Sequence, residues 1–278
     1  MKNINEQTKA FDNDKTSTYN LSFQISRRGY TYCILDSYSK KYVAINHIGY
    51  DTELSDDNLY DSIKTNLSKD SLLSKSYKSV DMIFVTKKNI IVPNTIFDKT
   101  KLKELVSANF SINENEEEIQ FNKIKSISAC NVFVIPSFVT TLMVNTFPEI
   151  NFYHQATPFI ENAIKNYGND ISVSVNLYYD TIDIVITNQG NLMFYNSFAY
   201  KTSSDALFIL STIFEKLKIK KTTPIMLSGY ITKKDDNFKL LYKYFPNVYM
   251  ADLNNSYEFP FSDVQEHQFY NLMNLPCA

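Results

Sequence analysis

Two carboxylates flank a turn in the stretch VNLYYDTID, and their type and spacing suggest chemistry more directly than any other pair in the chain. Asp180 lies in the turn, and Asp183 lies on the strand that follows it. Two carboxylates held together can bind a metal ion or divide the acid and base roles of a reaction. The structural alternative is that Asp180 forms the turn and Asp183 is a satisfied polar group on a strand. The sequence leaves both interpretations open.

The histidines and cysteines predict neither a metal site nor a nucleophilic enzyme. They are His47, His154, His267, Cys33, Cys130 and Cys277. The histidines lack partners at metal-ligand spacing, which favours structural or surface roles. Cys33 and Cys130 lie in apolar strand patterns, where cysteine usually behaves as a small buried hydrophobic residue. Three widely separated cysteines predict no disulfide framework, and no serine occupies a G-x-S-x-G elbow. We expect no bound cofactor.

The composition indicates a globular protein without a nucleic-acid or membrane partner. Hydrophobic residues make up 44% of the 278 residues and charged residues 21%, and the net charge is -2. A chain so close to neutral has no overall positive field to attract nucleic acid or an anionic membrane. No signal peptide is evident, and no run approaches the roughly 18 apolar residues of a membrane span. A reducing, cytoplasmic location follows.

Apolar alternation and helical spacing predict the same order of elements twice, which is a βββαβα plan. In the first half, strands are expected at 21–26, 29–36, 40–50 and 79–87, with a helix at 57–67. In the second half, strands are expected at 171–178, 181–187, 190–199, 224–230 and 248–253, with helices at 204–217 and 235–244. The repeat predicts an α/β protein with two lobes, each a mixed sheet with helices on its faces.

The boundaries of the lobes follow from this repeat. We expect a polar arm at 1–18, a first lobe at 19–168 with an insertion at 88–125, and a second lobe at 169–260. The tail at 261–278 is expected to pack on the first lobe. If the turn that holds Asp180 is tight, Asp183 should point from a strand face into the cleft between the lobes.

The segment between the lobes carries a resemblance to a known fold. The strand end FVIPSF, a helix begun by Pro158 and the stretch VNLYYDTID follow one another in an order typical of actin, the Hsp70 ATPase domain and pilus-assembly ATPases. The layout resembles this actin-like ATPase superfamily over most of the chain, which implies duplicated ribonuclease H-like lobes. The stretches STYNLSFQIS and CILDSYSKKYVAI also resemble a bacterial family described as having this fold and no assigned function.

The nucleotide motifs of the superfamily are largely replaced. In its second phosphate loop, V-D-I-G-G-G-T-T-D, the residues that match are Val175, Thr181 and Asp183, whereas those that differ are Asn176, Tyr178, Tyr179 and Asp180. Asn176 stands where the family has a magnesium-associated aspartate, and the next three replace glycines. The first loop, D-x-G, falls on Gln24, Ile25 and Ser26. The adenosine motif L-x-G-G keeps Leu227 and Gly229 but has Tyr230 at its second glycine.

These replacements oppose phosphate binding for a physical reason. Phosphate loops use successive backbone N–H groups, and glycine allows both the unusual φ angles and the close approach of the phosphate. A carboxylate at about 4 Å from a phosphate charge costs on the order of 4 kcal/mol at an effective dielectric constant near 20. The chain has only five glycines, and they form neither a P-loop nor a dinucleotide fingerprint.

The sequence therefore favours a noncatalytic scaffold or interaction protein of bacterial origin, with an unidentified protein partner and an open oligomeric state. The alternative is a divergent ATP-binding protein or ATPase that uses the interlobe cleft. In that case the resemblance places Asp180, Thr181, Asp183 and Gly229 near the phosphates or the adenosine. A binder of small molecules or peptides is a third possibility, because such folds form pockets between their lobes.

Overall fold

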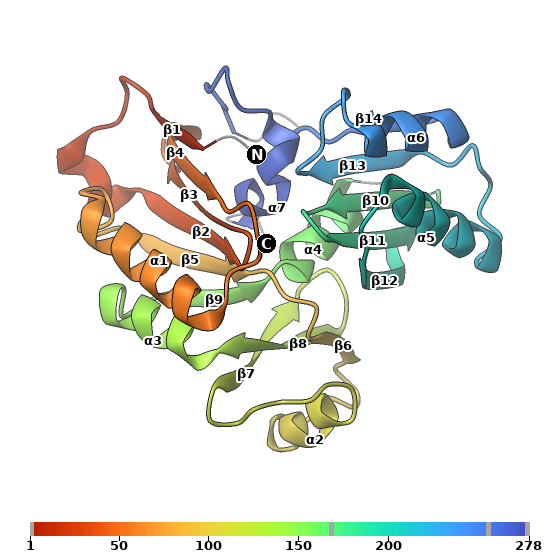
Figure 1. Cartoon of the computed structure of the whole chain (residues 1–278), viewed down its shortest axis with the longest axis horizontal. Coiled ribbons are helices and arrows are strands. Elements are labelled where there is room, and N and C mark those ends of the chain that lie inside the picture. Colours follow the sequence, from red (N-terminus) through yellow and green to blue (C-terminus); the bar gives the residue numbers. More distant parts are fainter. Residues whose placement is uncertain (1–2, 167–169, 254–256, 276–278) are drawn as a thin grey trace.

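The first sheet forms because apolar residues alternate along its strands (Figure 1). Leu21, Phe23 and Ile25 are fully buried on one face, where helices α1 and α3 pack against them. The strand order is β1-β4-β3-β2-β5-β9. The strands are β1 (Ile4–Gln7), β2 (Asn20–Ser26), β3 (Gly29–Asp36), β4 (Lys41–Gly49), β5 (Ser79–Phe84) and β9 (Asn151–His154). The helices are α1 (Asp56–Lys69) and α3 (Ser137–Thr146).

The opposite face of the first sheet is covered by the C-terminal part of the chain. Cys33, Leu35 and Tyr42 form one apolar cluster with Phe269 and Leu272. These last residues come from a 3-10 turn at Glu266–Phe269 and from α7 (Tyr270–Met273). The computed structural model describes residues 3–166, 170–253 and 257–275. Cys277, named above, lies outside this part of the chain.

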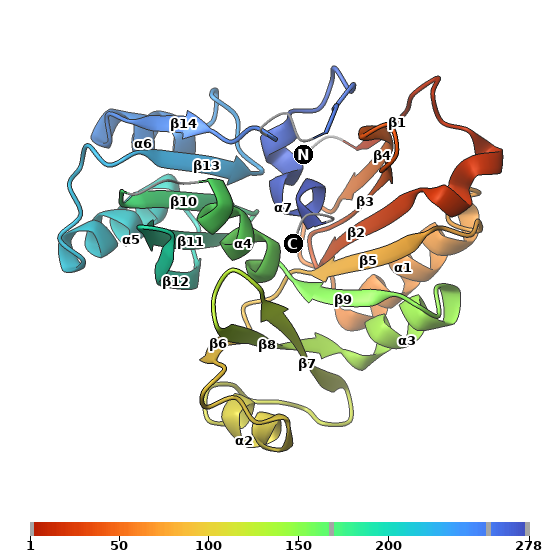
Figure 2. The same ribbon diagram turned by 180° about the vertical axis from the view of Figure 1, so that it is seen from behind.

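The second sheet repeats the plan of the first. Its order is β12-β11-β10-β13-β14, in which the first three strands are antiparallel and the last two are parallel to β10. Helices α5 and α6 cover one face and α4 covers the other (Figure 2). The strands are β10 (Ser172–Leu177), β11 (Thr181–Asn188), β12 (Asn191–Ala199), β13 (Ile225–Gly229) and β14 (Val248–Met250). The helices are α4 (Ala156–Asn166), α5 (Ser203–Lys216) and α6 (Asp236–Tyr244).

The equivalent order β4-β3-β2-β5-β9 lies within the first sheet, with the same parallel and antiparallel pairings. The duplicated βββαβα plan with mixed sheets is therefore present in the structure. One strand goes beyond the plan: β1, from the segment expected to be a polar arm, pairs antiparallel with β4 and places Ile4 opposite His47. Its sequence, INEQ, is too short and too polar to show a strand pattern.

A small third sheet is formed by a segment inserted into the first lobe, between β5 and α3. Its order is β6-β8-β7, and α2 packs on it through Val106, which is buried with Val132 and Val134. The strands are β6 (Asn89–Pro93), β7 (Glu117–Ile124) and β8 (Ala129–Pro136), and α2 spans Leu102–Ser107. Strands β6 and β7 and helix α2 fall within or overlap the stretch 88–125 that the sequence predicts to be an insertion.

Gly229 ends β13 at a point where only glycine fits. Its φ is +91°, and a Cβ atom there would lie 2.1 Å from the carbonyl oxygen of Leu177 on the neighbouring strand β10. A side chain would therefore suffer both left-handed backbone strain and a collision with main chain. The absence of a side chain at Gly229 therefore allows the ends of β10 and β13 to lie in close contact.

We expect Gly229→Ala to lower the free energy of unfolding by roughly 2 to 4 kcal/mol, since strain and overpacking add. Urea unfolding followed by circular dichroism measures the loss. Gly190→Ala is the matched control, because Gly190 has a φ of +73° but no atom within 4 Å of the position that a Cβ atom would take. The control should lose only about 1 to 2 kcal/mol. Equal losses in the two variants would contradict the close approach to β10.

Candidate functional site

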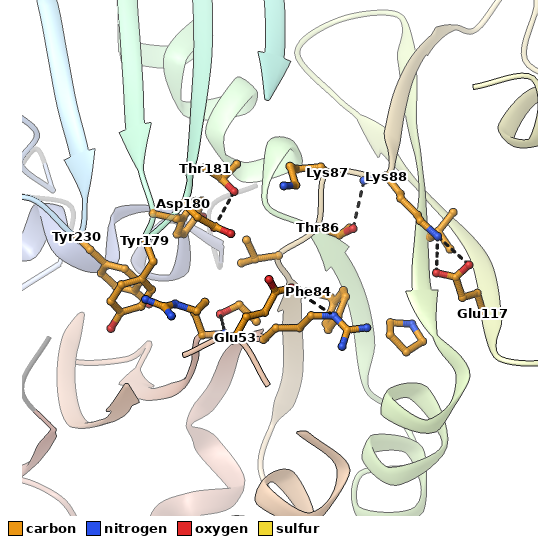
Figure 3. A pocket seen from close by; sticks show the side chains of 17 residues that line it. Glu53, Phe84, Thr86, Lys87, Lys88, Glu117, Tyr179, Asp180, Thr181 and Tyr230 are labelled. Carbon is orange, nitrogen blue, oxygen red and sulfur yellow. Dashed lines mark hydrogen bonds and ion pairs between the residues drawn. The ribbon is translucent and has the colours of Figure 1, made fainter. Parts of the chain in front are cut away.

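A cavity of about 290 Å³ opens between the two lobes (Figure 3). Its walls come from the β2–β3 turn, the end of β5 with the loop that follows, the β10–β11 turn and Tyr230. Because the two sheets have the same strand order, equivalent strand ends and hairpins of both lobes meet at this place. The volume lies at the lower limit of ligand pockets, which span about 300 to 1,000 Å³.

The β10–β11 turn is a tight hairpin closed by its own hydrogen bonds. The backbone N–H of Tyr178 donates to the carbonyl oxygen of Thr181 at 2.8 Å. The carbonyl oxygen of Tyr178 accepts from the Tyr200 hydroxyl at 2.7 Å, and that of Asp180 accepts from the Tyr200 N–H at 3.0 Å. None of residues 177–181, all of them described, has a positive φ. The turn lacks the left-handed residues with which phosphate loops aim several N–H groups at one anion.

Aromatic rings cover the cavity wall beside this turn. The ring centroids of Tyr179 and Tyr230 lie 4.8 Å apart, and the guanidinium of Arg28 lies 4.8 Å above the Tyr179 ring. Figure 3 shows both tyrosines on one side of the cavity. Tyr178 is only 6% exposed, and its hydroxyl accepts a hydrogen bond from Asn271 of α7 at 3.1 Å. Tyr178 therefore anchors the turn to the core, and Tyr179 faces the cleft.

Residues that replace the nucleotide motifs contact one another across the cleft. The side-chain amide of Gln24, on β2 of the first lobe, donates to the Tyr230 hydroxyl of the second lobe at 3.4 Å. The resemblance aligns Gln24 with the first-loop aspartate and Tyr230 with the second adenosine-motif glycine. Sequence analysis could identify each replacement but not the contact, because 206 positions separate the two residues.

The charges around the cavity are mostly paired. Arg27 forms a salt bridge with Asp56 at 2.5 Å, and Lys88 forms one with Glu117 at 2.6 Å. Lys87, also on the cavity wall, has no ion pair among the residues that the structure describes. Surface pairs of this kind contribute little to stability. Because Arg27 and Lys88 are paired, Lys87 and the stacked Arg28 are the cations of the cavity wall that are available to bind an anion.

The residues singled out from the sequence separate into two groups. Asp180 and Thr181 line the cavity, and the Thr181 hydroxyl donates to the Asp180 carboxylate at 3.0 Å. Asp183 and Gly229 are not among the lining residues. Asp183 lies instead on the buried α4 face of the second sheet. It follows Thr181 by two residues on β11, so the two side chains share a face, and Asp183 lies further along the strand, under the helix. The expected carboxylate pair is therefore split between the cleft and the core.

Asp183 belongs to a row of polar side chains across the second sheet. Its neighbours in register are Ser197 on β12, Asn176 on β10 and, one strand further, Ser228 on β13. Ser228 donates to the Asn176 side-chain oxygen at 2.8 Å. Both carboxylate oxygens of Asp183, the Ser197 hydroxyl and the Asn176 amide nitrogen are buried without a hydrogen-bond partner.

This burial changes the protonation of Asp183. Desolvation raises the pKa of Asp183 to about 7. The Ser197 hydroxyl and the Gln155 amide lie close enough to lower the pKa in part, although neither meets hydrogen-bond geometry with the carboxylate. Below about pH 7 the carboxyl is therefore mostly neutral in the core of the sheet, which suits a core residue better than a ligand for a metal.

The histidines are structural, as the sequence predicts. All three are buried. The Nδ1 atom of His47 lies 2.8 Å from the Thr31 hydroxyl, and the Nε2 atoms of His154 and His267 lie 2.9 and 2.8 Å from backbone carbonyl oxygens. Over the described residues, no three His, Cys, Asp or Glu side chains are grouped to hold a metal ion. In the same part of the chain, every helix is too short or too polar to cross a membrane.

A family model described as a protein of unknown function (DUF3822) matches residues 7–248. The chain belongs to this family. A Bacteroides thetaiotaomicron protein with an actin-like ATPase fold and unknown function is similar to it in structure, with 25% identity and a TM-score of 0.78. The match covers 89% of the present chain and 95% of the Bacteroides chain. No curated protein matches in sequence.

The PilM–PilN type IV pilus biogenesis complex also contains a similar chain. Its TM-score is 0.59 at 9% identity, over 91% of this chain and 96% of that chain. At such low identity the likeness concerns the fold alone. Together the two structures confirm that the DUF3822 chain has the actin-like ATPase fold that its sequence resembles.

The raised pKa of Asp183 predicts how stability depends on pH. Between the unfolded value near 3.8 and about 7, the folded protein binds more protons than the unfolded chain, so this group makes stability fall as pH rises. The loss approaches about 1.4 kcal/mol per pH unit, or on the order of 4 kcal/mol in total. Asp183→Asn cannot ionise, so its stability relative to the parent protein should increase from about pH 4.5 to about pH 8.

Urea unfolding of both proteins at the two pH values measures this difference. Asp180→Asn is the matched control, because Asp180 is exposed in the same hairpin. Its stability relative to the parent protein should change little over this range. Parallel pH profiles for the parent protein and Asp183→Asn would show that Asp183 ionises as easily in the folded state as in the unfolded one.

Proposed function

We propose that this DUF3822 protein is a noncatalytic, actin-like scaffold or interaction protein that has lost nucleotide binding. One observation carries the proposal: Tyr179 and Tyr230, which the resemblance places at two former nucleotide motifs, pack together on the cavity wall, and Gln24, at the third, donates to the Tyr230 hydroxyl. In a nucleotide-binding relative these positions would leave space for the ligand. Here the protein's own side chains contact each other in that space.

The local chemistry supports this proposal. A phosphate needs a bare main chain with converging N–H groups, whereas the β10–β11 turn is closed on itself and carries the Asp180 carboxylate beside the cavity. The remaining space of about 290 Å³ is small for a nucleoside triphosphate. Keeping the fold without the phosphate contacts is useful to a protein whose surface, rather than its cleft, carries the function.

A protein partner fits this role. The similar chain in the PilM–PilN complex shows a fold of this type assembled with another protein. The net charge of -2 offers no general attraction for nucleic acid or for an anionic membrane. The proposal is thus a bacterial, cytoplasmic protein that acts through protein contacts.

The second candidate is a divergent ATP-binding protein or ATPase. It is favoured by Lys87, a cavity cation without an ion pair among the described residues, together with the Arg28 guanidinium on the Tyr179 ring. In this version Asp180 and Thr181 would lie beside the phosphates, whereas Asp183 and Gly229 would act only by supporting the turn and the end of β13. Nucleotide would also have to displace Tyr179 or Tyr230.

Calorimetry and thermal unfolding with Mg-ATP and Mg-ADP test the two candidates. We expect no binding heat and no rise in Tm at about 1 mM nucleotide. Binding would be easy to detect, because a ligand at a hundred times its Kd stabilises the fold by about 2.7 kcal/mol. Micromolar binding that is lost in Lys87→Ala but kept in Lys233→Ala, a lysine outside the cleft, would overturn the scaffold proposal and support the divergent ATP-binding protein.

A further inference from the structure

The sheets of this protein protect their edges in different ways, and one edge is left unprotected. The outer strands are β1 and β9 in the first sheet, β14 and β12 in the second, and β6 and β7 in the third. An outer strand presents unpaired N–H and C=O groups that can pair with another chain. Shortness, proline and charge are the usual protections against such pairing.

Five of these six strands carry one of these protections. Strands β1 and β9 have four residues each, and β14 has three. Strand β6 has five residues and ends in Pro93, and β7 contains Glu117, Glu118 and Lys123. Strand β12, in contrast, has nine residues, NLMFYNSFA, with neither a charge nor a proline. Figure 1 shows β12 at the outer edge of the second sheet.

The geometry of β12 leaves a straight stretch available for pairing. A bulge interrupts its register with β11 next to Met193, and Phe194–Ala199 then pairs regularly with β11. The N–H of Ser197 donates to the side-chain oxygen of Asn196 at 2.9 Å instead of to a strand. This group therefore points outward, and a local side chain occupies it in place of a neighbouring strand. Asn196 and Ala199 are exposed along the same stretch.

We propose that β12 is a self-association surface that pairs antiparallel with β12 of a second copy of this chain. In a two-fold dimer the strand pairs with its own copy, with residue i facing residue j and j facing i, so a charge near the middle of the strand lies close to the same charge of the other copy. An uncharged strand avoids this repulsion in every register, unlike β7 with its two adjacent glutamates. The net charge of -2 also gives little repulsion between whole molecules.

Such pairing would join the two second-lobe sheets into one continuous sheet. A two-fold axis perpendicular to the sheet keeps α5 and α6 of both copies on one face and α4 of both copies on the other. Phe194 and Phe198, whose rings stack with centroids 6.5 Å apart on the α5 face, would then extend an apolar row across the junction. No residue of β12 is among those that line the cavity, so the inference does not depend on whether the cleft binds nucleotide.

Sedimentation of the full chain from about 1 µM to about 200 µM tests the proposal, and we expect a monomer–dimer equilibrium. Hydrogen exchange of the Phe194–Ala199 amides should slow as concentration increases, since pairing protects outward N–H groups. Asn196→Lys places a charge on the edge and should weaken association by about tenfold or more. Ser197→Pro, which removes an outward N–H, should do the same.

The control is Phe208→Lys, which places the same charge on an exposed residue of α5 away from the strand edge. This variant should associate like the parent protein, and all variants are checked for unchanged circular dichroism. A monomer at every concentration would overturn the proposal. A dimer that Asn196→Lys and Ser197→Pro leave intact, or whose β12 amides exchange at the same rate at all concentrations, would overturn it as well.

Discussion

The structure depends most on the side-chain contacts through which the two lobes meet. Gln24 of the first lobe donates to the hydroxyl of Tyr230 of the second, and Tyr230 packs against Tyr178, Tyr179 and Phe269. These aromatic contacts add dispersion and apolar burial at the junction between the lobes.

This constraint explains why the neighbouring elements are so rigidly tied. Tyr178 is held by Asn271 and Tyr200, which fixes the β10–β11 turn, and Gly229 allows β13 to end against the backbone of Leu177. The C-terminal segment takes part in both lobes, because Phe269 and Leu272 pack on the first sheet and Tyr270 packs with α4. These contacts tie the two halves of the protein to each other.

The buried polar row shows what the second sheet keeps in its core. Asp183, Asn176 and Ser197 lie side by side under α4 with several atoms unpaired, which is unusual in a core and expensive unless the carboxyl is neutral. The raised pKa of Asp183 is the physical solution that the fold adopts. The same sheet has no charged residue on β12, one of its two outer strands.

The sequence by itself determined the elements of the two repeated lobes, because period-two alternation and helical spacing are local properties of strands such as β3 and helices such as α5. It also identified the replaced motif residues Gln24, Tyr179 and Tyr230 one at a time. It did not reveal β1, whose four residues include a single apolar one and form a strand only because β4 offers an edge. Long-range packing brings Gln24 to Tyr230 and turns Asp183 toward α4 rather than the cleft. Those outcomes depend on which residues far apart in the chain become neighbours, and pattern along a chain carries no information about that.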